Sequence, residues 1–477
     1  MKAAWIIVLA LGCASEKGID TQSDASEDSS DKVEAVDTGG GGIVSERDYR
    51  SATWCAECHP TQYAEWEQSM HRYAAHSPVF DRMTAKAVRD TAGATGTFCT
   101  GCHTPLGTMD GEPGTTTAAD RSDISLEGVT CVVCHQAVAH EAPVGNTSLV
   151  IDLEAPIQGV FESSASTTHL SVKSDLLSSP ELCGSCHDVF NFPGLRIEEA
   201  YTEYTESPAA EAGIRCQDCH MSQVPGTTSE RPMGRAAVIE GVDTPERPLS
   251  SHRFIGPDYS MLDSFPYPDD PAKTVAAQED MRVQTEVLLK NSVRLADVQL
   301  DESSAGSELR VTVESLTEGH RVPTGFTSER QLWVAVDVVE DGEIVWQSGD
   351  LDAYGDLRNE LSWEVMAGDV EHDDQLVNFQ SKNLVRSDID LIDVVPANVF
   401  EVIFPFDATY IHRESLKPLE SRQLVYSMPS LSSDAEVRVR LRYRNLPPYV
   451  LRALLLDELV ERLQIVDIDE QVLEGAK

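Results

Sequence analysis

The stretch Cys55-Ala56-Glu57-Cys58-His59 is the first of five copies of one pattern, Cys-x-x-Cys-His, and this pattern decides the fold. The chain contains eleven cysteines, and ten of them belong to the five copies. Two thiols three positions apart can each form a thioether to one edge of a porphyrin, and the histidine that follows can bind the iron. The pattern therefore predicts five covalently attached haem c groups. The copies, numbered here as motifs 1 to 5, are Cys55-Cys58-His59, Cys99-Cys102-His103, Cys131-Cys134-His135, Cys183-Cys186-His187 and Cys216-Cys219-His220.

Two other uses of paired cysteines compete with haem attachment. Zinc ribbons combine two such pairs and do not require a histidine after each one, whereas here the number of pairs is odd and every pair has its histidine. Disulfides are common in oxidising compartments, but the uniform spacing of the five pairs disfavours a disulfide framework. Haem attachment explains both the number and the spacing of the cysteines.

The N-terminus has the form of a secretory signal peptide over residues 1–12. Lys2 precedes an apolar run, residues 3–11, which is too short to span a membrane. Residues 9–13, Leu-Ala-Leu-Gly-Cys, resemble a bacterial lipobox, in which Cys13 would be lipidated and tether the protein to a membrane. Ordinary cleavage with a free Cys13 is the alternative. We expect an extracytoplasmic lipoprotein on the periplasmic or outer face of the outer membrane, with a disordered acidic linker over residues 13–47.

The charge of the chain is strongly acidic. Eighty acidic and 37 basic residues give a formal net charge of −43. Such a surface disfavours nucleic-acid binding. It favours partners that present lysine and arginine.

The apolar pattern divides the rest of the chain into three parts and predicts an α+β multidomain fold. Residues 48–275 contain all five motifs with little chain between them, which predicts a pentahaem domain of short helices and loops; the clearest helix covers residues 61–75. After a helix at residues 274–289, period-two runs predict an antiparallel β-sandwich within residues 276–445, and residues 446–477 contain a final helix at 449–463. The runs are Leu309-Val311-Val313, Leu332-Val334-Val336-Val338, Val399-Val402 and Val437-Val439-Leu441-Tyr443.

One of these strands has arginine at every second position on its other face. The arginines are either a solvated face in an acidic protein, which we favour, or contacts for haem propionates or a partner. They are Arg438, Arg440, Arg442 and Arg444.

Eight histidines lie outside the motifs, which is enough to give each of five irons a second axial ligand. An iron with two histidine ligands exchanges electrons but has no open position for a substrate. His76 is a reserve candidate, His372 belongs to an acidic, solvated stretch and His412 has no supporting context. The five histidines expected as distal ligands are His71, His140, His169, His252 and His320.

Residues 50 to 260 resemble the cytochrome c554 family. The string from Cys55 to Pro60, followed by Tyr63, Trp66, Ser69 and His71, is similar to the opening of that family, and residues 128–135 are similar to one of its haem sites. The resemblance implies that His71 and a histidine downstream of motif 3, here His140, are axial ligands. It also implies closely stacked haems in parallel and perpendicular pairs. One haem of such a set can have an iron with an open position. The string Cys216-Gln217-Asp218-Cys219-His220-Met221 resembles a motif of multihaem cytochromes related to hydroxylamine oxidoreductase. The fifth motif and the β-sandwich depart from the four-haem c554 pattern.

These features predict a membrane-tethered multihaem cytochrome that transfers electrons in a respiratory chain, with other cytochromes or a quinol-oxidising complex as redox partners. The alternative is a multihaem oxidoreductase that acts on a small nitrogen or sulfur oxyanion at one open haem, so whether the chain is an enzyme stays open. No catalytic residue stands out, because no Cys-x-x-Cys-Lys variant of the motif is present. A third possibility is that the sandwich docks the haem domain onto a partner.

Overall fold

The structure is a computed structural model that describes residues 49–162, 168–191, 194–303, 306–386 and 399–474. The predicted signal peptide, Cys13 and the acidic linker to residue 47 lie outside the described residues. The described residues form one compact unit. Two regions of this unit differ in architecture: the motif region (residues 49–270) and the β region (residues 293–474). The helix α12 (Pro271–Ser292) joins them, so the boundary predicted at residue 275 falls inside a helix.

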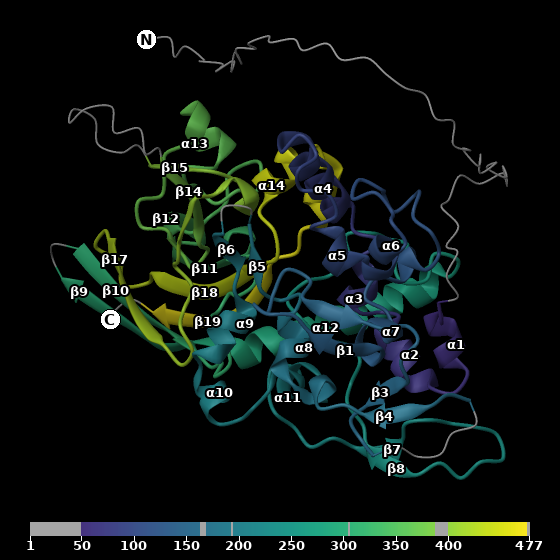
Figure 1. The fold of residues 1–477 in the computed structure, drawn as a ribbon. Coiled ribbons are helices and arrows are strands. Elements are labelled where there is room, and N and C mark those ends of the chain that lie inside the picture. Colours follow the sequence, from purple (N-terminus) through teal and green to yellow (C-terminus); the bar gives the residue numbers. More distant parts are fainter. Residues whose placement is uncertain (1–48, 163–167, 192–193, 304–305, 387–398, 475–477) are drawn as a thin grey trace, which may run out of the picture. The chain divides into compact units, whose positions relative to one another are not determined.

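The motif region consists of short helices and loops, as predicted (Figure 1). Four two-stranded sheets, which the sequence pattern did not predict, fasten the loops: β1 (Ala137–His140) with β2 (Leu149–Ile151), β3 (Ile157–Gly159) with β4 (Ser171–Lys173), β5 (Val189–Phe190) with β6 (Arg196–Glu198), and β7 (Met233–Arg235) with β8 (Glu246–Pro248). The helices are α1 (Ala52–Ala56), α2 (Pro60–Trp66), α3 (Met70–Tyr73), α4 (Pro78–Asp90), α5 (Thr100–His103), α6 (Pro105–Met109), α7 (Cys131–His135), α8 (Pro180–Gly184), α9 (Ala200–Thr205), α10 (Pro208–Glu211) and α11 (Cys216–His220).

The helix predicted for residues 61–75 is two helices in the structure. The extended backbone of Ser69, with φ −74° and ψ 161°, separates α2 from α3. Serine in a helix interior competes with the helical backbone for hydrogen bonds, which favours a cap over a continued turn. Both halves stay anchored, because Trp66 and Tyr73 are buried and Trp66 Nε1 donates to the Val129 carbonyl at 2.8 Å. His71 therefore lies on a helix that is separate from α2.

Two antiparallel sheets form most of the β region. One consists of β9 (Val293–Ser303), β10 (Gly306–Ser315) and β17 (Ser421–Met428) in the order β17-β10-β9. The other has the order β12-β11-β18-β19, with β13 (Val377–Asn378) also paired to β11; its strands are β11 (Gln331–Glu340), β12 (Glu343–Ser348), β18 (Glu436–Arg444) and β19 (Val466–Glu474). A smaller third sheet contains β14 (Lys382–Arg386), β15 (Val399–Glu401) and β16 (Tyr410–His412). The helix α13 (Trp363–Ala367) precedes these strands in the chain.

The two large sheets share one apolar core, to which three of the four predicted period-two runs contribute. The fourth run, Val399–Val402, lies at β15 of the third sheet and is not part of this core. Alternate residues of β10 and β18 are buried, and Leu309, Val311, Val439 and Leu441 have no exposed surface. The strand β11 is buried on both faces. Its second face carries Trp333, which packs in a smaller cluster with Ala335 and Leu357. Burial of both faces explains the nearly continuous apolar run of this strand.

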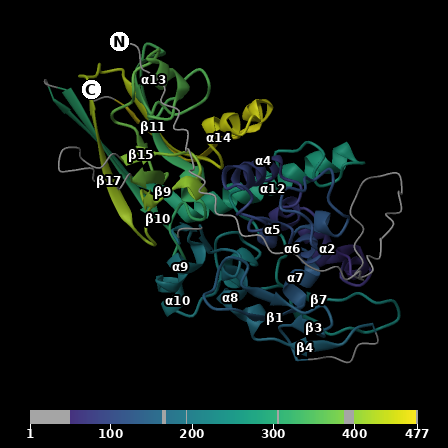
Figure 2. The ribbon, with the colours of Figure 1, turned by 45° about the horizontal axis from the view of Figure 1, so that its top comes forward.

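The C-terminal helix predicted for residues 449–463 is wrong in its length, and the tail after it is a strand. The helix α14 (Pro448–Ala453) ends where Leu455 takes φ 59°, a left-handed conformation that an α-helix of L-residues cannot continue. A 3-10 turn follows at Asp457–Arg462, and β19 then adds an antiparallel edge to β18. Figures 1 and 2 show α14 beside α4, and Val79 and Met83 of α4 pack against its apolar cluster.

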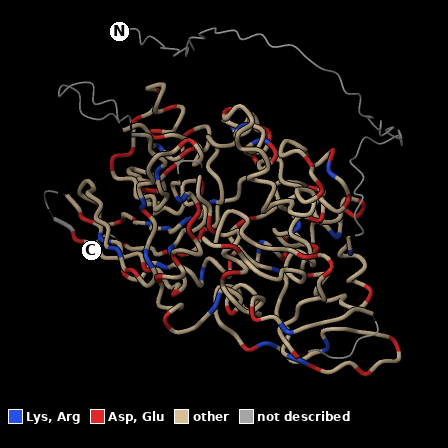
Figure 3. Tube along the Cα trace, in the orientation of Figure 1, with Lys and Arg blue, Asp and Glu red and all other residues tan. Residues whose placement is uncertain are grey.

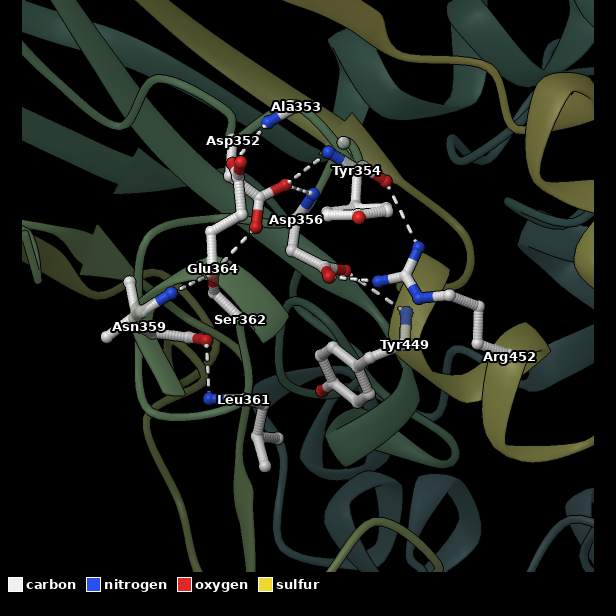
Figure 4. A network of polar contacts seen from close by, with 12 residues as sticks. Asp352, Ala353, Tyr354, Asp356, Asn359, Leu361, Ser362, Glu364, Tyr449 and Arg452 are labelled. Carbon is white, nitrogen blue, oxygen red and sulfur yellow. Dashed lines mark hydrogen bonds and ion pairs between the residues drawn. The ribbon is translucent and has the colours of Figure 1, made fainter. Parts of the chain in front are cut away.

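A polar network holds α14 onto the β region (Figure 4). The Asp352 carboxylate accepts the backbone N–H of Tyr354 at 2.9 Å and of Asp356 at 2.8 Å, which closes a tight turn. The buried Asp356 carboxylate then accepts the backbone N–H of Tyr449 at 3.1 Å and forms an ion pair with Arg452. Because these groups bond to one another, the network explains how residues after β18 are anchored.

The four arginines of β18 pair mainly with neighbouring strands. Arg442 Nε donates to Asp467 of β19 at 2.7 Å, Arg440 forms an ion pair with Asp337 of β11, and the buried Arg444 Nε donates to Gln331 at 2.9 Å. Three of the four arginines therefore form cross-strand pairs, and only Arg444 is fully buried. Arg438, whose side chain is 41% exposed, lies closest to Glu436 of its own strand and fits the solvated face that we favoured. Acidic residues are distributed over both regions (Figure 3).

Candidate functional site

Each motif lies on a single helical turn. In motif 1 the His59 N–H donates to the Cys55 carbonyl at 2.9 Å, and in motif 4 the His187 N–H donates to the Cys183 carbonyl at 2.9 Å. This i to i+4 bond places the first cysteine and the histidine on one face of the turn. The ten cysteines are half-buried thiols in the described residues, and none of them forms a disulfide there. The local geometry is the one that attachment to a porphyrin edge requires.

Four of the five motif histidines face a second histidine. A metal with a nitrogen ligand at about 2 Å on each side separates the two imidazole centroids by roughly 6 Å. The observed separations match this spacing, so the residues fit a haem iron between each pair. The pairs are His59 with His169 at 6.4 Å, His187 with His71 at 6.3 Å, His135 with His252 at 6.4 Å, and His220 with His320 at 6.1 Å.

In several of these histidines the Nδ1 nitrogen contacts a backbone carbonyl. Nδ1 of His59 lies 2.7 Å from the Ala236 carbonyl, and Nδ1 of His135 lies 2.8 Å from the Gln158 carbonyl. Nδ1 of His320 lies 2.8 Å from the Arg321 carbonyl. A carbonyl accepts only from a protonated Nδ1, which leaves Nε2 with its lone pair free to bind a metal.

Burial favours the neutral form of these imidazoles. It lowers the pKa of His71 to about 3, with help from the nearby His187, His220 and His103. Burial likewise lowers the pKa of His252 to about 4, and the neighbouring His135 adds to this shift. The neutral imidazole is the form that binds metal, so these histidines are ready to act as ligands at neutral pH.

Motif 2 differs from the other four. The ring of His103 stacks on Phe80 with centroids 4.1 Å apart and an interplanar angle of 4°. Among the described residues, no histidine faces His103 at the spacing of the four pairs. His76, the reserve candidate, packs against Phe265 at 5.5 Å, and its Nε2 is buried without a hydrogen-bond partner in the described residues. Residue spacing did not single out Phe80.

The structure does not bring His140 opposite a motif histidine. Its ring is exposed at the end of β1, with Nδ1 3.3 Å from the Glu141 carbonyl, in a shallow depression beside Leu176 and Glu181. Proximity in sequence to motif 3 did not translate into proximity to an iron site, because β1 pairs with β2 and leads away from the motif. Two further histidines that were not expected as ligands lie beside carboxylates: His372 Nδ1 is 3.0 Å from Asp374, and His412 Nε2 is 2.7 Å from Glu414.

Contacts between thiols give the order of the motifs in space. The thiols of Cys55 and Cys131, of Cys183 and Cys216, and of Cys102 and Cys186 lie close enough to shift each other's pKa. These proximities place motif 1 beside motif 3, motif 4 beside motif 5, and motif 2 beside motif 4. The Cys134 thiol of motif 3 is close enough to Cys183 of motif 4 to raise its pKa further. The motifs therefore form a line 1-3-4-5, with motif 2 as a side branch from motif 4.

The four pairs combine distant parts of the chain. His71 comes from α3, His169 precedes β4, and His252 follows β8, all within the motif region. His320 comes from the β region, in the loop between β10 and β11. The β region thus completes the site at motif 5.

Comparison with known proteins agrees with this geometry. Residues 54–136 match the family described as cytochrome c554 and c-prime. The crystal structure of a penta-haem cytochrome c552 from Thermochromatium tepidum is similar to 89% of this chain and 99% of its own, with a TM-score of 0.56 and 19% sequence identity. At this identity the likeness shows the fold. No curated protein matches the chain. The two likenesses support a multihaem c-type cytochrome that binds haem c, as the resemblance implied.

The described part of the chain contains no helix that is both long and apolar enough to cross a membrane.

Proposed function

We propose that this chain carries five haems and transfers electrons through them outside the cytoplasm. The observation that carries the proposal is the set of four histidine pairs at 6.1–6.4 Å, each of which includes one motif histidine. A haem held by two histidines supplies reversible one-electron chemistry at low potential. Two features support the proposal: burial lowers the pKa of His71, and the Nδ1 contacts of His59 and His135 with carbonyls favour the tautomer with a free Nε2.

The contacts between motifs support transfer along a line. Motif 1 and motif 5 are the two ends of the line 1-3-4-5 and are the expected points of entry and exit. Redox partner proteins, such as other cytochromes or a quinol-oxidising complex, would dock near these ends. The net charge of −43 favours partners with cationic docking faces.

The test is electron paramagnetic resonance of the oxidised, haem-loaded protein, together with a haem count per chain. Five haems with four low-spin signals are expected from the four histidine pairs. Fewer than five haems, or high-spin signals from more than one of them, would contradict the proposal.

A second candidate function is an oxidoreductase that acts on a small nitrogen or sulfur oxyanion at motif 2. It is favoured by one observation: His103 faces no histidine at ligand spacing in the described residues, and Phe80 stacks on its ring. Motif 2 is also a branch from the line, so a substrate there would not interrupt transfer. Titration with cyanide distinguishes the two functions. One high-spin haem that binds cyanide and responds to nitrite or sulfite would support the enzyme. Five low-spin haems that do not bind cyanide would support electron transfer as the only function of the haems.

The proposal includes a lipid anchor at Cys13. The apolar run of residues 3–11 and the lipobox-like residues 9–13 support it. The variant Cys13→Ala tests it, because the protein should move from the membrane fraction to the soluble fraction. Unchanged membrane association would remove the anchor from the proposal.

A further inference from the structure

The loop of residues 319–325 carries His320 from the β region to motif 5, and one carboxylate of the motif region binds this loop at two points just after the histidine. We propose that Glu203 is a positioning residue that holds this loop closed and so keeps His320 opposite His220. The inference rests on the proposed function in one respect, namely that His320 is an axial ligand.

The loop is fastened to its own region first. The backbones of Val322 and Leu416 exchange two hydrogen bonds of 2.9 Å, and the Arg321 guanidinium donates to the Ser415 carbonyl at 3.1 Å. The Thr317 hydroxyl donates to the His320 carbonyl at 2.8 Å. These bonds shape the loop, but they do not tie it to motif 5.

Glu203 supplies the tie to the motif region. Its Oε2 accepts the backbone N–H of Arg321 at 3.1 Å and the hydroxyl of Thr324 at 2.6 Å. These donors lie one and four residues after His320, so the carboxylate spans the part of the loop next to the ligand. Only 7% of the Glu203 side chain is exposed. Burial raises the pKa of Glu203 to about 7, and the two hydrogen bonds oppose that rise.

Glu203 is itself placed by motif 4. It lies on α9, whose first residues bond to that motif: the Tyr201 N–H donates to the His187 carbonyl at 3.0 Å, and the Thr202 hydroxyl donates to Asp188 at 2.9 Å. A single short helix therefore connects the motif 4 histidine to the loop that bears His320. The position of His187 at motif 4 is in this way coupled to the position of His320 at motif 5.

Other contacts hold the two regions together without Glu203. Arg330 of the β region donates to both carboxylate oxygens of Asp258, at 2.7 and 2.9 Å. The Ala209 N–H donates to the Glu318 carbonyl at 3.1 Å. Loss of the Glu203 carboxylate should therefore release the loop and leave the regions associated.

The experiment compares haem-loaded Glu203→Ala and Thr324→Val with wild type, and uses His320→Ala to identify the low-spin signal of motif 5. Glu206→Ala is the matched control, because Glu206 is an exposed carboxylate just after the same helix. Cyanide is titrated and the loss of the motif 5 signal is followed. Since cyanide must displace His320, its apparent affinity rises in proportion to the open fraction of the loop. Glu203→Ala should lower the half-loss concentration roughly tenfold or more, as expected for the loss of two hydrogen bonds to one carboxylate. Thr324→Val should give a smaller shift, and Glu206→Ala none.

Imidazole gives a second readout that a general loss of stability would not produce. It should restore the motif 5 low-spin signal in Glu203→Ala by replacing the displaced ligand. If Glu203→Ala does not fold, Thr324→Val carries the test, because it removes one donor and leaves the Glu203 carboxylate in place. Half-loss concentrations equal to wild type in these variants would overturn the role of Glu203 alone. A motif 5 signal that persists in His320→Ala would overturn the ligand assignment as well, which separates the two failures.

Discussion

The motif region and the β region are held together by different interiors. The β region contains one large apolar cluster that joins both sheets, with fully buried side chains such as Val311, Val336 and Leu441. The described apolar clusters within the motif region are small, for example Leu106 with Val132 and Val133. Its centre holds buried imidazoles, and its ten cysteines are only half-buried. The difference indicates that haem completes the interior of the motif region, whereas the β region folds on its own side chains.

The largest expected effect follows from producing the chain without haem attachment. The β region should keep slow amide hydrogen exchange in β10, β11 and β18, because its core needs no cofactor. Residues 49–270 should exchange rapidly, since short helices with small apolar clusters do not offset the conformational entropy of ordering. Hydrogen exchange followed by mass spectrometry measures both regions in one sample. Equal protection in the two regions would show that the motif region has a sufficient core of its own.

Replacing one buried imidazole tests the same contrast at a single site. In His71→Leu the new side chain has a volume similar to that of histidine. A leucine of this kind would be an ordinary packing residue in the core of the β region. In the motif region it should cost motif 4 its second ligand, because His71 lies 6.3 Å from His187. Electron paramagnetic resonance should then show one low-spin signal lost, and a redox titration should show one shifted potential.

His372→Leu is the control for that variant, because the His372 ring is partly exposed and its Nδ1 contacts Asp374 at 3.0 Å, away from the motif histidines. It should leave every haem signal in place. Equal spectra for the two variants would remove His71 from the ligand set.

The sequence predicted the parts of the site that depend on local spacing. The five motifs and the single-turn geometry within each follow from residues four positions apart, and the strands around Val311 and Val439 follow from alternation. His71, His169, His252 and His320 were selected by context, and the structure places each opposite a motif histidine.

What depends on tertiary packing was not predictable. His140 is close to motif 3 in sequence, but β1 carries it to an exposed position. The left-handed Leu455 ends α14 early, and no local signal at that leucine distinguishes it from a helical one. Glu203 lies far from His320 in the sequence, and Phe80 lies on a different helix from His103. No local motif could therefore identify either residue.

A cavity in the β core should destabilise the protein without touching the haems. Leu441→Ala removes a fully buried side chain between the sheets and should lower the free energy of unfolding by about 2–5 kcal/mol. Val425→Ala on the outer face of β17, where 53% of the valine is exposed, should change it by less than about 0.5 kcal/mol. Urea unfolding followed by circular dichroism gives both values. Altered haem spectra in folded Leu441→Ala would show that the two interiors are coupled.

A pH-dependent effect is expected where the two regions meet, beside the Arg330–Asp258 ion pair. Burial raises the pKa of Glu329 to about 8, and its Oε1 has no hydrogen-bond partner among the described residues. In the unfolded chain the carboxyl titrates near its ordinary pKa of 4.5. The native state therefore binds a proton that the unfolded state releases, so this contribution to stability is complete below pH 4.5 and is lost as the pH rises through 8. Glu329→Gln keeps the neutral shape and should abolish that loss. Its melting temperature should match wild type near pH 5 and exceed it near pH 8, while the exposed Glu458→Gln follows wild type at both. A constant difference between Glu329→Gln and wild type from pH 5 to 8 would mean that Glu329 is ionised in the folded protein. The contact between the two regions would then accommodate a buried carboxylate charge at Glu329 in addition to the Arg330–Asp258 ion pair.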